Sequence, residues 1–322
     1  TSLTSVNLGS TVTTIGFRAF ANTAITEITI PESVQAIDSS FVLCSELSAI
    51  NYNAINAQSE GNTFDSAGEN TDGVTVVIGD KVEVIPDKLF SWTNLAEIQF
   101  GSSLHTIGEY AFNRCGENIT EFTIPASVTT IGAYAFYKCS VLESITVEGS
   151  PVIGDSAFYE CAALKEINLG EATEIGANAF RGCTALTDVT IPGSVTVIGE
   201  AAFDSCEDLM SVTTDGTQTI GKNAFSNCRK LSEVTLGEGL LTIEGYAFNN
   251  CSSLKTLTIP ASVTEIKLAA FMGVSFDSVI FKQPSGWTEV ATEKAVERSV
   301  LSDPASAAEY ISGYNDHIAR EV

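Results

Sequence analysis

Carboxylates and thiols are the side chains of this sequence that could most readily take part in catalysis or metal binding. The chain has 40 Asp and Glu, eight Cys and only two His, His105 and His317. A catalytic Ser or Cys usually needs a His within reach, and two isolated His form no such pair. The carboxylates recur regularly, so no two of them stand out as an acid–base pair. We therefore expect no enzymatic activity and no catalytic residue.

Metal binding is weakly indicated. The eight Cys include no C-x-x-C pair, the spacing typical of zinc and thioredoxin sites. The segment from Glu60 to Asp72 carries oxygen ligands that suit Ca²⁺, but it lacks the D-x-[DN]-x-[DN]-G pattern of a calcium loop. A solvated acidic loop is the simpler interpretation. We expect no metal site and no cofactor.

The composition excludes several partners. Lys and Arg total 16 and Asp and Glu total 40, so the formal net charge is −24. This charge disfavours nucleic acid and anionic membranes, and no apolar run of about 18 residues predicts a membrane span. The sequence starts at Thr1 without a charged-then-apolar leader, and Leu3, Val6 and Leu8 have the spacing of a strand. We expect the sequence to begin inside an array, with any export signal lying before it.

The elements that position these side chains come from a repeat. A Phe, usually after Ala, recurs every 22 to 24 residues from Phe90 onward, an Ile stands five residues before most of these Phe, and a Gly often follows that Ile. The Phe positions are Phe20, Phe41, Phe64, Phe90, Phe112, Phe136, Phe158, Phe180, Phe203, Phe225, Phe248 and Phe271. An L-x-x-I-x-I stretch follows each Phe and has the alternation of a short strand.

A unit this short cannot bury its own apolar face, so the repeat predicts a solenoid of about 12 stacked coils. One strand per coil, recurring in register, must run parallel to its neighbours. The Gly after each Ile suits a tight corner with positive φ.

All eight Cys lie three residues after a Phe, which predicts one column of small buried side chains near the corner. The Cys are Cys44, Cys115, Cys139, Cys161, Cys183, Cys206, Cys228 and Cys251. Thr23, Ala67, Thr93 and Val274 occupy the same position in other coils. We interpret the column as reduced structural thiols rather than disulfides.

Two segments depart from the period. Residues 53–75 predict a stretched coil, in which Phe64 and Ala67 keep their repeat positions. Residues 282–322 leave the repeat, and Asp303-Pro304 marks a helix start, with a helix over about 304–312 that would bring Ala307, Ala308 and Ile311 onto the last coil. We therefore divide the chain into a solenoid, 1–281, and a capping tail, 282–322.

The repeat resembles the BspA-like, or Treponema-type, leucine-rich repeat of bacterial surface proteins. The string I-G-x-x-A-F-x-x-C-x-x-L-x-x-I-x-I-P-x-S-V-T is matched by the stretch from Ile131 to Leu142 and by Ile259-Pro260-Ala261-Ser262-Val263-Thr264. The resemblance covers about residues 1–281. It implies a mostly β, right-handed, curved solenoid with parallel strands, short helical or 3-10 turns and a small C-terminal cap. It also implies export and a role in adhesion at the cell surface.

The outward positions of the strands form two polar columns, one rich in carboxylates and its neighbour in Thr and Asn. The candidate binding residues on this strand-lined, concave face are Glu97, Glu121, Thr123, Glu166, Asn168, Asp188, Thr190 and Glu233. Glu97/Glu121 and Glu166/Asp188 are the expected closest acidic pairs. Polar residues that simply suit an exposed strand explain the columns as well as a recognition strip does. Almost no aromatic residue lies on the strip, which disfavours sugar stacking there, and Trp92 and Trp287 are interpreted as packing residues.

The sequence thus favours a non-enzymatic, monomeric scaffold at the bacterial cell surface or outside the cell. The leading hypothesis is an adhesin that engages a basic extracellular protein of a host matrix or a microbial surface. A carbohydrate-binding module and a structural spacer are the alternatives.

Overall fold

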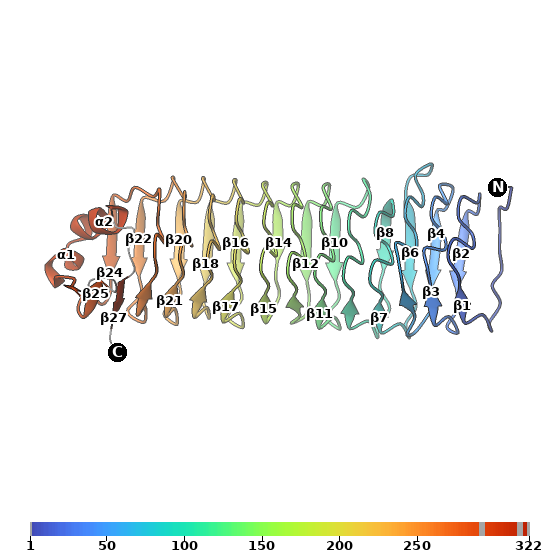
Figure 1. The fold of residues 1–322 in the computed structure, drawn as a ribbon, viewed down its shortest axis with the longest axis horizontal. Coiled ribbons are helices and arrows are strands. Elements are labelled where there is room, and N and C mark those ends of the chain that lie inside the picture. Colours follow the sequence, from blue (N-terminus) through green and yellow to red (C-terminus); the bar gives the residue numbers. More distant parts are fainter. Residues whose placement is uncertain (1, 290–293, 314–317, 321–322) are drawn as a thin grey trace. The chain divides into compact units, whose positions relative to one another are not determined.

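The computed structural model describes residues 2–289, 294–313 and 318–320. The chain forms two compact units, Thr1–Ala162 and Ala163–Val322. Each unit is a stack of coils, in which successive turns of the chain place their short strands side by side (Figure 1). The predicted mostly β solenoid of parallel strands and about 12 coils is confirmed.

The predicted strands form one wall of each coil, which we call the long-strand face. Their outward residues are largely polar and their inward residues apolar, as in β10, where Phe122 and Ile124 are buried and Glu121 and Thr123 are exposed. In the first unit these strands are β2 (Glu27–Ile30), β4 (Ala49–Tyr52), β6 (Val74–Ile78), β8 (Leu95–Gln99), β10 (Glu121–Ile124) and β12 (Ser144–Val147). In the second they are β14 (Glu166–Asn168), β16 (Asp188–Ile191), β18 (Ser211–Thr214), β20 (Glu233–Leu236), β22 (Thr256–Ile259) and β24 (Ser278–Phe281).

A second wall of two-residue strands was not predicted. Except for β5, which lies in the stretched coil, each ends in an Ile, and most of these are the Ile that stands five residues before the Phe. The strands of the first unit are β1 (Thr14–Ile15), β3 (Ala36–Ile37), β5 (Gln58–Ser59), β7 (Val84–Ile85), β9 (Thr106–Ile107), β11 (Thr130–Ile131) and β13 (Val152–Ile153). Those of the second are β15 (Glu174–Ile175), β17 (Val197–Ile198), β19 (Thr219–Ile220), β21 (Thr242–Ile243) and β23 (Glu265–Ile266).

The Gly after this Ile is explained by close packing, and the prediction of positive φ is wrong. Gly132, Gly199 and Gly221 have ordinary φ values. A Cβ on Gly199 would lie 2.5 Å from the carbonyl of Gly176 in the coil before it. Any side chain here would therefore push two coils apart.

The segment around each Phe consists of consecutive hydrogen-bonded turns rather than short helices. Residues two before and two after the Phe have positive φ, for example Tyr110 at 55° and Arg114 at 52°. This conformation costs a non-Gly residue about 1–2 kcal/mol, and hydrogen bonds to the next coil offset the cost. The N–H of Phe112 donates to the carbonyl of Ala135 at 2.8 Å. The N–H of Arg114 donates to the carbonyl of Tyr137 at 2.9 Å.

The Phe side chains stack on one another through the interior of each unit. Ring centroids of consecutive Phe lie 5.0 to 5.6 Å apart from Phe20 to Phe158. They lie 5.2 to 5.5 Å apart from Phe180 to Phe271. Burying one such side chain stabilises the fold by about 1.5–3 kcal/mol.

The Cys column lies beside the Phe column, as predicted, and all eight thiols are free and buried. Several of these thiols donate a hydrogen bond to the coil before: Cys139 to the Phe112 carbonyl at 3.1 Å and Cys228 to the Phe203 carbonyl at 3.2 Å, for example. Burial raises the pKa of Cys228 well above 9.0 and that of Cys251 to about 12. The column is a set of small buried hydrogen-bond donors.

Residues 53–75 contain a coil with a longer connection than its neighbours. Phe64 stacks on Phe41 at 5.2 Å, and both Phe64 and Ala67 are fully buried. The extra residues lie in the turns between β5 and β6. The two-residue strands are interrupted here, because β5 and β7 belong to separate sheets.

The predicted helix in the tail is confirmed as α2 (Pro304–Gly313), preceded by an unpredicted α1 (Arg298–Ser302). The carboxylate of Asp303 accepts a hydrogen bond from the Ser306 N–H at 2.8 Å, which makes it the N-cap. Ala307, Ala308 and Ile311 are buried, and α2 packs on the last long strand, β24.

Three further strands of the tail were not predicted: β25 (Trp287–Glu289), β26 (Lys294–Ala295) and β27 (Ile318–Arg320). β27 pairs antiparallel with β23, so the tail closes the two-residue strands with a strand and the long strands with a helix. Trp287 is buried, as interpreted, with its indole N–H donating to the Gln283 carbonyl at 3.0 Å. Such long-range antiparallel pairing leaves no periodic signal in the sequence.

The predicted strand at Leu3, Val6 and Leu8 is wrong. Residues 2–9 have no regular structure, Leu3 is 41% exposed, and the first strand is β1. Of the helices in the described ranges, none has the length and apolar character of a membrane span.

Candidate functional site

The long-strand face holds all eight predicted binding residues on outward positions, and all eight are exposed. Glu97, Glu121 and Thr123 belong to the first unit. Glu166, Asn168, Asp188, Thr190 and Glu233 belong to the second. The alternation of each strand is sufficient to place them there.

Carboxylates on this face do not lie opposite one another in the paired strands. Glu121 is opposite Ser144, and Glu97 is opposite Thr75. Ser211 lies between Asp188 and Glu233, and its hydroxyl donates to the Asp188 carboxylate. Hydroxyl residues therefore separate the acidic side chains, which limits the repulsion that like charges opposite each other would cause.

The two predicted close acidic pairs fall at interruptions of the sheet. β8 and β10 are not hydrogen-bonded to each other, and neither are β14 and β16. Glu97 and Glu121 are therefore not register partners, and the same holds for Glu166 and Asp188. Gly116, which has a φ of 84°, lies in the segment between β8 and β10.

Cations are concentrated away from this face, where they form ion pairs with other carboxylates. Lys81 pairs with Glu32 at 2.9 Å and Lys230 with Asp208 at 2.8 Å. Within residues 2–289, 294–313 and 318–320, no ion pair is formed by Glu97, Glu121, Glu166, Asp188 or Glu233. The long-strand face of each unit therefore has negative charge that no neighbouring cation neutralises.

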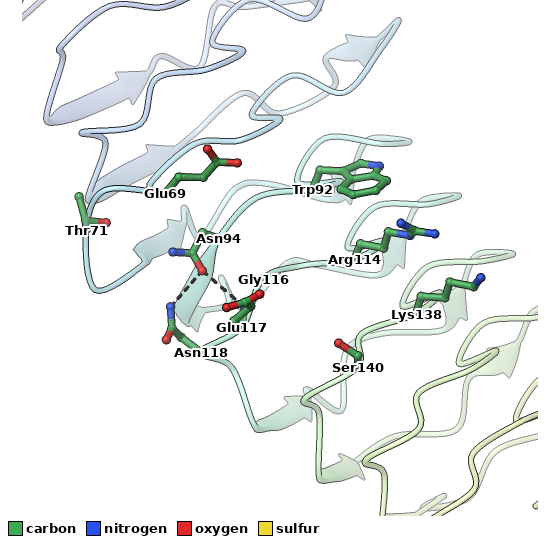
Figure 2. Close-up of a pocket in the computed structure, with 10 residues that line it drawn as sticks. All are labelled: Glu69, Thr71, Trp92, Asn94, Arg114, Gly116, Glu117, Asn118, Lys138 and Ser140. Carbon is green, nitrogen blue, oxygen red and sulfur yellow. Dashed lines mark hydrogen bonds between the residues drawn. The ribbon is translucent and has the colours of Figure 1, made fainter.

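A surface pocket of about 840 Å³ lies wholly in the first unit, next to the interruption between β8 and β10 (Figure 2). We call it the Trp92 pocket. It is lined by Glu69, Thr71, Trp92, Asn94, Arg114, Gly116, Glu117, Asn118, Lys138 and Ser140. Its lining is mainly polar, which distinguishes it from the apolar cleft typical of drug-like ligands.

One side of the pocket is a row of three side chains from consecutive coils (Figure 2). Trp92, Arg114 and Lys138 each stand two residues after the coil's Phe, where φ is positive. The Arg114 guanidinium lies 4.4 Å from the centre of the Trp92 ring, a cation–π contact. The Lys138 ammonium contacts Glu160 at 3.1 Å, and this hydrogen bond is the main cause that raises the pKa of Lys138.

The other side of the pocket carries amides and carboxylates (Figure 2). The Asn118 amide donates to the Asn94 side-chain oxygen at 2.9 Å, and the Asn94 amide donates to the Gly68 carbonyl at 3.0 Å. These bonds hold Asn118 against the stretched coil and leave its amide oxygen as an acceptor. Glu117 and Glu69 add carboxylates.

This pocket was not predicted from the sequence, and the interpretation of Trp92 as a packing residue is wrong. Trp92 is 44% exposed and packs on Arg114 rather than in the core. A signal was present: the Phe64–Phe90 and Phe112–Phe136 spacings, which flank the pocket, are the long ones in the array. Three large side chains also occupy a repeat position that is Glu160 in the next coil and Gly, Ser or Asn in the coils after it.

The two His and the possible metal ligands remain to be described. His105 is exposed, its Nδ1 lies 3.0 Å from the Thr106 hydroxyl, and its Nε2 lies 3.8 Å from Glu83. His317 lies outside the described residues. In the described part of the chain, no three His, Cys, Asp or Glu gather closely enough to hold a metal ion, the segment from Glu60 to Asp72 included.

The sequence matches a known family model, the BspA type leucine rich repeat region, over residues 1–72, 65–186 and 173–291. The chain belongs to this family of leucine-rich-repeat proteins. The family is a scaffold fold built from repeats. No curated protein matches the chain.

Among solved structures, the chain is similar to a leucine-rich repeat protein from Bacteroides ovatus, with 24% identity over 80% of this chain and 81% of that one and a TM-score of 0.45. It is similar to a leucine rich cell surface protein from Faecalibacterium prausnitzii, with 23% identity over 84% and 83% and a TM-score of 0.45. It is also similar to the pneumococcal vaccine antigen PcpA, with 20% identity over 84% and 67% and a TM-score of 0.46.

Proposed function

We propose that this BspA-type protein is a non-enzymatic, monomeric adhesin of the bacterial cell surface. It engages a basic extracellular protein, of a host matrix or of another microbe, through the long-strand face. The contact residues are Glu97, Glu121, Thr123, Glu166, Asn168, Asp188, Thr190 and Glu233. No cofactor takes part.

The observation that supports this proposal is the distribution of charge. Cations of the chain pair with carboxylates away from the long strands, whereas the carboxylates on the long strands pair with none in the described ranges. A basic partner gains attraction from this face and loses little to competing internal ion pairs. Ser and Thr between the carboxylates supply hydrogen bonds that a protein backbone can use.

Surface location has separate support. Family membership is typical of proteins exported to the bacterial surface, and one similar structure is that of a leucine rich cell surface protein. The chain's strong negative charge also disfavours nucleic acid as a partner.

The test is binding of the chain to a panel of extracellular-matrix proteins and glycans at low and moderate salt. We expect saturable binding to a basic protein that weakens as salt rises. The double variant Glu121→Lys/Glu166→Lys should weaken it by about 10-fold or more, since each reversal replaces attraction by repulsion.

The matched control is Glu60→Lys/Glu174→Lys, which changes the net charge equally but lies off the long strands at two exposed positions. We expect near wild-type affinity for this control. Equal losses in both double variants would contradict a role for the long-strand face. Absence of any ligand would favour the spacer alternative.

A further inference from the structure

The Trp92 pocket is a second surface with chemistry of its own, and its feature of most interest is Arg114. Among the residues that the structure describes, no carboxylate or carbonyl accepts a hydrogen bond from its guanidinium. By contrast, Arg181 pairs with Asp204 at 3.0 Å and Arg320 donates to the Ala261 carbonyl at 2.7 Å. The donors of Arg114 are thus available to a ligand.

The cation–π contact with Trp92, 4.4 Å from the ring centre, restricts the motion of that guanidinium. A planar fork held in one orientation loses less entropy when it binds a carboxylate through two parallel hydrogen bonds. Lys138 stands on the next coil of the same row, held by Glu160. Arg114 has no ion-pair partner among the described residues, and Lys138, although paired with Glu160, has further ammonium protons to donate.

The facing side has the opposite character. Glu69 and Glu117 offer carboxylate oxygens, and Asn118 offers an amide oxygen, because its nitrogen already donates to Asn94. These acceptors suit hydroxyl groups. The cavity of about 840 Å³ falls in the usual size range of small-ligand sites, about 300–1,000 Å³.

A ligand that matches both sides carries a carboxylate on one edge and several hydroxyls on the other. We propose that the Trp92 pocket binds a short acidic saccharide, with its carboxylate on Arg114 and Lys138 and its hydroxyls on Glu69, Glu117 and Asn118. This site is separate from the long-strand face and does not depend on the adhesin proposal. A protein ligand fits less well, because the polar lining offers no apolar cavity for an anchoring side chain.

The test titrates the whole chain with two acidic probes, a hyaluronan hexasaccharide and 3′-sialyllactose, and follows binding by calorimetry and by tryptophan fluorescence. Trp92 is exposed and Trp287 is buried, so a ligand-dependent change in emission reports the pocket. We expect saturable binding of at least one probe. The carboxyl-reduced hexasaccharide and neutral lactose should bind at least about 10-fold more weakly.

Arg114→Gln should weaken binding of the acidic probe by about 10-fold or more, while the thermal unfolding midpoint stays near wild type. Arg114→Lys, which keeps the charge but loses the planar fork, should be intermediate and serves if the first variant does not fold. Lys230→Gln is the control, because it removes an exposed, ion-paired cation of the second unit. It should bind as wild type.

Other outcomes would overturn the proposal. Equal affinity for the acidic and carboxyl-reduced hexasaccharides would exclude carboxylate recognition. Equal affinity for a hexaglutamate peptide would assign the pocket to acidic peptides rather than sugars. No binding of either acidic probe would refute saccharide binding at the Trp92 pocket. An equal loss of affinity in Lys230→Gln would refute it as well.

Discussion

Gly221 lies so close to the preceding coil that a Cβ on it would stand 2.4 Å from the carbonyl oxygen of Ile198. Gly221 directly follows β19, whose Ile220 pairs with Ile198 of β17 in the second unit. Parallel strands lie only about 4.8 Å apart, and at this corner the backbones come closer than a side chain permits. The coil spacing therefore depends on glycine at this position.

Gly221→Ala is expected to destabilise the second unit by about 1–3 kcal/mol, the usual cost of forcing atoms into a packed region. The measurement is urea unfolding followed by circular dichroism. Gly193→Ala is the matched control, because the nearest atom to its added Cβ lies 4.0 Å away and its φ is ordinary. That variant should stay within about 1 kcal/mol of wild type. Equal stability of the two variants would refute the close-packing explanation.

Phe225→Ala is expected to lower the free energy of unfolding by about 3–5 kcal/mol. The ring is fully buried and stacks on Phe203 at 5.3 Å and on Phe248 at 5.4 Å. Phe17→Ala removes a ring that is 67% exposed and should have little effect. Denaturant titration compares the two, and a small effect in Phe225→Ala would mean that the coils repack around the lost ring.

The Cys column predicts a loss of stability at alkaline pH. Burial raises the pKa of Cys251 from 9.0 to about 12, so the folded chain keeps this proton where the unfolded chain releases it. Stabilisation by the protonated thiol is complete below about pH 9 and declines as pH rises from 9 towards 12. Unfolding titrations under reducing conditions between pH 8 and 11 should show the decline.

Cys251→Ala removes one titrating group and should make that decline shallower, whatever its effect on stability at neutral pH. Tyr52, whose pKa burial also raises above 10.0, adds to the loss at the upper end of the range. An unchanged slope in the variant would show that this thiol does not contribute. The buried thiols should also resist a thiol reagent until the chain unfolds.

Asp303→Ala is expected to destabilise the capping tail, because α2 loses its N-cap hydrogen bond from Ser306. Asp303→Asn retains an acceptor and should be nearly neutral. The bond from Ser306 lowers the pKa of Asp303 below 3.8, so the charged cap stabilises the fold above that pH and is lost as pH falls below it. Hydrogen exchange of α2 amides measures the local effect, and equal exchange in the two variants would contradict it.

The repeat in the sequence was sufficient to predict the solenoid, its parallel strands and the Phe and Cys columns. Each of these follows from which residues are apolar and how far apart they recur, and coils in register bring equal positions together. The same logic placed Glu121, Asp188 and the other candidates on exposed strand positions. The helix at Pro304 was predictable because its cap is a local signal.

Tertiary structure alone decided the features that depend on contacts between coils. The sequence cannot show that Gly221 meets the Ile198 carbonyl, that the sheet is interrupted between Glu97 and Glu121, or that the tail strand Ile318–Arg320 pairs with Glu265–Ile266. The row of Trp92, Arg114 and Lys138 also forms only when three coils stack in register. Periodicity determines which residues share a column, whereas backbone spacing and irregular loops determine which of them can touch.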